Sequence, residues 1–163
     1  MEVGGLPLHP LIVHAAIGLV PLSALFAVLT ALAPGWRWFT RWGTLVASLA
    51  AVVVVVLTRA AGQSLLDEQY AGQPRIPEQL QTHQDRAGLL LVAVLALAVV
   101  AVAAFFLLPA RSALVTGKLE HAGSTAGWVR VVVPALLVVA AVASVVLVVM
   151  TGDAGARSVW ENR

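Results

Sequence analysis

Four long apolar runs constrain this 163-residue chain more than any other feature. They lie at residues 11–33, 42–61, 87–108 and 128–150. A bilayer hydrocarbon core of about 30 Å is crossed by about 20 helical residues, each rising about 1.5 Å. The runs are apolar on all sides, whereas strands of a membrane barrel alternate apolar and polar residues. We therefore predict an all-α membrane protein whose four transmembrane helices form one domain over residues 1–163.

Composition supports the membrane class and excludes several functions. The chain is 60% hydrophobic and 11% charged, and soluble domains have about a quarter charged residues. It contains no cysteine, which excludes disulfides, thiolate catalysis, iron–sulfur ligation and c-type haem attachment. The net charge of +2 arises from few groups, mainly arginines in short loops. It therefore bears on membrane topology and does not indicate nucleic-acid binding.

The lengths of the connecting segments predict the topology. They span residues 34–41, 62–86 and 109–127, which favours two helical hairpins in an up-down bundle. Four crossings place both termini and the middle segment at one membrane face. Lys and Arg are evenly divided between the faces, but the other face carries them in shorter segments, and seven of the eight acidic residues lie with the termini. This pattern favours termini outside the cytoplasm.

Ionisable side chains gather at the face that carries the termini. His14 and Arg59 each lie about one turn inside an apolar span, where an ionisable group is costly and suggests a functional site. Asp153 is the expected partner of Arg59, which could alternatively reach the interface as an inert anchor. The full polar cluster is His9, His14, Arg59, His83, Asp85, Arg86, Asp153 and Arg157.

Two histidines of this cluster suggest a cofactor site. His14 and His83 belong to separate hairpins and could face each other across the bundle, an arrangement that suits two imidazole ligands of a b-type haem. His9 precedes Pro10 at the expected helix cap and is a further cofactor-binding candidate, or an interfacial residue.

A metal ion is the alternative cofactor. Its candidate ligands are His14 and His83, with Asp85 and Asp153 as the carboxylates. A cluster that contains no cofactor and only holds the helices together remains open, because two histidines in four helices arise easily without a ligand.

A short internal repeat links the hairpins. Residues 58–62 and 151–155, which end the second and fourth spans, both read T-x-x-A-G. The first helix of each hairpin carries a histidine shortly before a glycine. His14 lies four residues before Gly18, and His83 lies five residues before Gly88. Two such hairpins would be related by an axis along the membrane normal.

The two ends of the chain resemble a known family. Residues 6–14 read LPLHPLIVH, followed by Ile17 and Gly18, and residues 151–156 read TGDAGA. These segments resemble a widespread uncharacterised bacterial membrane domain that opens with an H-P-x-x-V-H-F-P-I-G motif and closes with T-G-x-x-G. Ala15 and Ala16 depart from the Phe-Pro of that motif. By position, the resemblance assigns motif roles to His9, His14, Gly18, Thr151, Gly152 and Gly155.

The resemblance implies a location in a bacterial cytoplasmic membrane. Some relatives are fused or adjacent to Rieske-type iron–sulfur domains, which implies a function alongside redox proteins. Our leading hypothesis is a redox accessory protein with a haem or metal site near the outer face; the alternative is a cofactor-free structural or assembly subunit. The expected partners are membrane lipid and a membrane redox complex or a second copy of the chain. A transporter is disfavoured because the inner halves of the spans lack ionisable groups, and no enzymatic motif surrounds Ser64 or Ser158.

Overall fold

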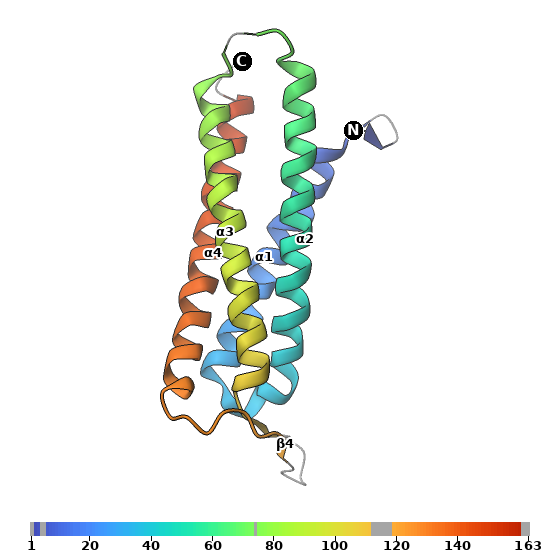
Figure 1. Cartoon of the computed structure of the whole chain (residues 1–163). Coiled ribbons are helices and arrows are strands. Elements are labelled where there is room, and N and C mark those ends of the chain that lie inside the picture. Colours follow the sequence, from blue (N-terminus) through green and yellow to red (C-terminus); the bar gives the residue numbers. More distant parts are fainter. Residues whose placement is uncertain (1, 4–5, 74, 112–118, 161–163) are drawn as a thin grey trace.

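The fold is a bundle of four antiparallel helices. The computed structural model describes residues 2–3, 6–73, 75–111 and 119–160. Within these ranges, α1 spans Leu8–Leu32, α2 Arg37–Gln69, α3 Glu78–Leu107 and α4 Val129–Trp160. All four are long and apolar enough to cross a membrane. The up-down arrangement in Figure 1 confirms the predicted fold class.

The helices extend beyond the predicted apolar spans. The expected 62–86 connection is mostly helical, because α2 continues to Gln69 and α3 begins at Glu78. Likewise, α4 continues to Trp160. The extensions of α2 and α3 are rich in Gln, Leu and Glu, which favour helix whether lipid or water surrounds them. Apolarity marks the part of each helix suited to lipid, and it does not mark where the helix ends.

Short elements connect the helices. The 3-10 helix η1, Pro34–Trp36, joins α1 to α2. Strand β1, Glu2–Val3, pairs antiparallel with β2, Leu6–Pro7, and β3, Ala110–Arg111, pairs with β4, Leu119–His121. The start of α1, the end of α4 and the α2–α3 connection lie at one end of the bundle, which we call the terminal end; η1 and the β3–β4 hairpin lie at the opposite end (Figure 1).

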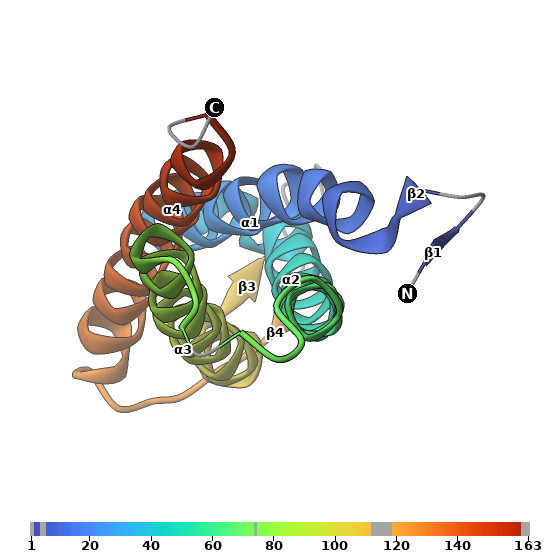
Figure 2. The same ribbon diagram turned by 90° about the horizontal axis from the view of Figure 1, so that it is seen from above.

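Small side chains dominate the interior. Figure 2 shows the four helices enclosing a common centre. One cluster packs Ala24, Ala27 and Ala31 of α1 against the fully buried Leu97 and Leu137. A second cluster, nearer the terminal end, is formed by Ala16, Val20, Ala51, Val55, Leu90, Val94 and Val148. Because small residues allow close approach of helices, such packing can hold a bundle together where lipid removes the usual hydrophobic driving force.

A buried arginine completes the C-terminal end of α1. Arg37 is 7% exposed, and its Nε and Nη2 donate to the carbonyls of Thr30 at 2.7 Å and Ala31 at 3.1 Å. The last four carbonyls of a helix lack intrahelical partners. Arg37 therefore satisfies two groups that would otherwise be unpaired in the interior. Beside it, the Thr30 hydroxyl is hydrogen-bonded to those of Thr40 and Thr44.

Removing this cap is expected to destabilise the bundle. Arg37→Ala should lower the free energy of unfolding by about 1.5–3 kcal/mol, the range for hydrogen bonds that involve a charged group. Thermal unfolding in detergent measures the change. Arg130→Ala, at an exposed position of α4, is the control and should unfold with the wild type. Equal midpoints for all three proteins would contradict the capping role.

Candidate functional site

His9 lies in the first turn of α1 and contacts α2. Its Nδ1 is 2.9 Å from the carbonyl oxygen of Thr58. A carbonyl can only accept a hydrogen bond, so Nδ1 carries the proton and donates it. In the neutral ring, this tautomer leaves the lone pair of Nε2 available to a ligand.

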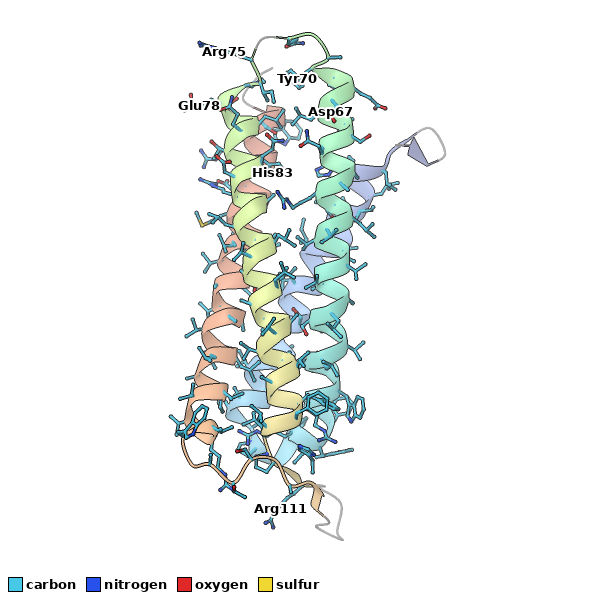
Figure 3. The ribbon with its side chains drawn as sticks, in the orientation of Figure 1. Asp67, Tyr70, Arg75, Glu78, His83 and Arg111 are labelled. Atoms are coloured by element: carbon cyan, nitrogen blue, oxygen red, sulfur yellow. The ribbon has the colours of Figure 1, made fainter. Side chains whose placement is uncertain are left out.

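His83 makes the same contact in the second hairpin. Its Nδ1, on α3, is 3.0 Å from the carbonyl oxygen of Thr151 on α4. The same argument assigns the proton to Nδ1 and the lone pair to Nε2. Figure 3 shows His83 near the connection that carries Tyr70 and Arg75, at the end of the molecule opposite Arg111.

Glycine allows each imidazole to reach its carbonyl. Residue i+4 of a helix lies beside the carbonyl of residue i, and Gly62 and Gly155 hold that position after Thr58 and Thr151. A Cβ at Gly62 would lie 3.0 Å from Cε1 and Nδ1 of His9, and one at Gly155 would lie 3.0 and 3.1 Å from the same atoms of His83. Both distances are tighter than ordinary van der Waals contact. The two T-x-x-A-G segments are therefore equivalent binding sites for an imidazole.

The two imidazoles meet inside the terminal end of the bundle. Their ring centroids are 6.2 Å apart and their planes are inclined by 89°. His9 and His83 come from different hairpins, so this contact crosses the bundle. The internal repeat thus brings together two histidines that each donate from Nδ1 to a backbone carbonyl.

His14 does not occupy the predicted place opposite His83. Its side chain is exposed, and its Nδ1 is 2.8 Å from the carbonyl of Pro10 in the same helix. Because α1 begins at Leu8, His9 is already helical, and five residues turn the side chain by about 140°. Only one of the two histidines can face the interior. The expectation that His14 faces His83 is therefore wrong in its geometry, and His9 takes that position.

A cavity of about 410 Å³ adjoins the histidines. All four helices line it, with an apolar wall that includes Val13, Val55, Leu90 and Val148. Its polar lining includes His9, Arg59, Gln63, His83 and Gln84. The volume lies within the range of about 300–1,000 Å³ common for small-molecule sites, and a mostly apolar wall with a few polar groups is typical of them.

Two polar side chains of α2 reach toward α3 along this cavity. Nε2 of Gln84 donates to Oε1 of Gln63 at 3.2 Å. One turn further from the terminal end, Nη2 of Arg59 lies 3.9 Å from the position that a Cβ of Gly88 would take. In the part of the chain that the structure describes, Arg59 makes no hydrogen bond or ion pair. In Figure 1, the α2 and α3 ribbons diverge toward the connection between them.

Asp153 does not pair with Arg59 as expected. Its Oδ2 lies 3.1 Å from Nε of Arg157 and 4.0 Å from Nη1 of Arg86, which also donates to the carbonyl of Met150 at 2.9 Å. Arg157 is one helical turn beyond Asp153, so the local pair forms between neighbouring positions on one helix face. The carboxylate is thereby held at the α3–α4 surface by these two arginines.

The predicted metal ligands are not gathered into one site. Asp85 is exposed, and Asp153 is held by the two arginines. Among residues 2–3, 6–73, 75–111 and 119–160, no three His, Asp or Glu side chains come together as a metal-binding group. The expected combination of His14, His83, Asp85 and Asp153 is therefore not formed. His9 and His83 are the two nitrogen donors that the fold brings together.

The family described as "Predicted membrane protein (DUF2231)" matches residues 5–163. The chain belongs to this family. The DUF2231 assignment covers the helical hairpins and both T-x-x-A-G segments, and it agrees with the four candidate spans. Comparison with curated proteins and with solved structures finds no match. DUF2231 membership supports an integral membrane protein and specifies no activity.

Proposed function

We propose that this DUF2231 protein binds a b-type haem between His9 and His83 and acts as a redox accessory protein of the membrane. The observation that carries the proposal is the matched tautomer of the two imidazoles. Each Nδ1 donates to a backbone carbonyl, at 2.9 Å for His9 and 3.0 Å for His83. Histidines that ligate a metal commonly have their second ring nitrogen held in this way, which orients the ring and increases its basicity.

The spacing of the rings supports ligation from two sides. Because a metal–imidazole bond is about 2 Å long, two imidazoles on opposite sides of one metal ion place their ring centres roughly 6 Å apart. The observed centroid separation is 6.2 Å. Ring planes inclined by 89° are compatible with two imidazoles that would hold one metal ion.

The surroundings suit a lipophilic cofactor. Apolar side chains from all four helices line the adjoining cavity. Burial and axial ligation are the means by which a protein adjusts the potential of a haem, while the haem itself carries the electron. We place the protein in a bacterial cytoplasmic membrane with the site near the outer face, where a membrane redox complex would exchange the electron.

Spectroscopy tests the proposal directly. Protein purified in detergent from cells with ample haem supply should show the visible bands of a low-spin b-type haem, sharpened on reduction by dithionite. Elemental analysis for iron, zinc and copper accompanies the spectra, and iron should predominate. A colourless, metal-free protein that also fails to take up added haem would contradict the proposal.

A cofactor-free structural role is the second candidate, and one observation favours it. The His9 and His83 hydrogen bonds join α1 to α2 and α3 to α4, so both rings already stabilise the hairpins without a ligand. In that case the histidines would contribute to stability alone. Added haem would then leave the thermal unfolding midpoint unchanged, whereas a specific ligand raises it.

A further inference from the structure

We infer that Arg59 binds the carboxylate of the ligand in the terminal cavity, so the cofactor enters as an acid, with a propionate directed between α2 and α3. This inference rests on the proposed function and deepens it, because it assigns the anionic part of the ligand to a named residue. The starting point is the placement of Arg59 in the cavity wall without a hydrogen bond or ion pair to any described residue.

Arg59 is exposed in the cavity wall and has no partner among the described residues, so its guanidinium is open to an anion from outside the chain. Arg59 belongs to a helix that is apolar enough to cross a membrane, and apolar residues of α1, α2 and α3 surround the cavity. A cation inside an apolar span is costly and is normally paired or directed to a cavity. Its expected partner within the chain, Asp153, is engaged with Arg157. The fold therefore leaves the guanidinium to a ligand.

The position of the guanidinium relative to the histidines fits a porphyrin acid. Arg59 follows Thr58, whose carbonyl holds His9, so both groups belong to the same turn of α2. Across the cavity, Arg59 reaches Gly88, which is five residues beyond His83, or about 7.5 Å along α3. A porphyrin held by the two imidazoles would therefore direct a carboxylate along α3 toward Arg59.

The chemistry of the side chain favours a carboxylate. The planar guanidinium offers parallel N–H donors that match the two oxygens of a carboxylate, and charge-assisted pairs of this kind are stronger than neutral hydrogen bonds. On the terminal side of Arg59, Gln63 and Gln84 are hydrogen-bonded to each other. Among the described residues that line the cavity, Arg59 is the only Lys or Arg side chain.

A porphyrin pair tests the inference. Haem-free protein in detergent is titrated with haem b and with its dimethyl ester, which lacks the negative charges, in the wild type, Arg59→Gln and Arg59→Lys. Wild type should bind the acid about tenfold or more tightly than the ester, as expected for a charge-assisted bond. Arg59→Gln should lose this preference while its affinity for the ester stays unchanged, and Arg59→Lys should restore part of it. Arg130→Gln, at the opposite end, is the matched control.

The outcomes separate the inference from the proposed function. If the wild type binds the acid and the ester with equal affinity, as Arg59→Gln does, the haem site stands and the role of Arg59 is refuted. If neither porphyrin binds the wild type, the proposed function is refuted and the inference with it. A lipid phosphate is the competing anion. Arg59→Gln could change porphyrin affinity only in nanodiscs with anionic lipid, and not in detergent or in neutral nanodiscs. That result would assign Arg59 to a lipid headgroup and overturn the inference.

Discussion

Replacing either His9 or His83 with alanine is expected to abolish the low-spin haem spectrum, whereas His14→Ala should keep it. Each of the first two changes removes one of the two imidazole rings that lie 6.2 Å apart across the bundle, and with it one of the two proposed Nε2 ligands. Losing a partner that only orients a metal ligand already costs about 10–100-fold in affinity, so loss of the ligand itself should cost more than about 100-fold. Absorption spectra and haem titrations of the three variants measure the effect.

His14→Ala is a matched control, because His14 has the same side chain on the same helix but is exposed and bonded within its own helix. All three variants should be checked for folding by circular dichroism. Equal haem affinity in His14→Ala and His83→Ala would contradict the assignment of His83. If the wild type takes up no haem and both His9→Ala and His83→Ala still lower its unfolding midpoint, the histidines have the structural role alone.

The second large effect is expected at Gly155. A leucine there would place its Cβ 3.0 Å from Cε1 of His83, and its remaining atoms would force the ring away from the Thr151 carbonyl. Overpacking of this kind costs about 1–3 kcal/mol. Gly155→Leu should therefore lower the unfolding midpoint in detergent and weaken haem binding together.

Gly18→Leu is the control for Gly155→Leu. A Cβ at Gly18 meets nothing within 4 Å, and leucine is a better helix former than glycine by roughly 0.8 kcal/mol. The control should be as stable as the wild type or slightly more so. The two substitutions should thus change the unfolding midpoint in opposite directions. A similar decrease for both would contradict the steric role assigned to Gly155.

Much of the candidate site could be predicted from the sequence, but the predicted histidine pair differs from the pair that the fold brings together. The clustering of ionisable groups at one end of the bundle and the two T-x-x-A-G segments were evident from the sequence. Depth within the apolar run favours His14 over His9, but depth says nothing about which side of a helix a residue occupies. The start of α1 at Leu8 would have shown His9 to be helical, and a glycine four residues after Thr58 marks a carbonyl that an imidazole can approach.

The sequence by itself determined the class and the helices of this protein. In lipid every backbone group must be paired within its own segment, so an apolar run of sufficient length has to be helical, even over the consecutive valines at residues 52–56. The tertiary structure alone decided which polar groups meet. His9 reaches Thr58 across 49 residues, and His83 reaches Thr151 across 68. Such contacts depend on how the helices rotate and slide against one another, and that is set by small-residue packing along their whole length, beyond the reach of any local pattern.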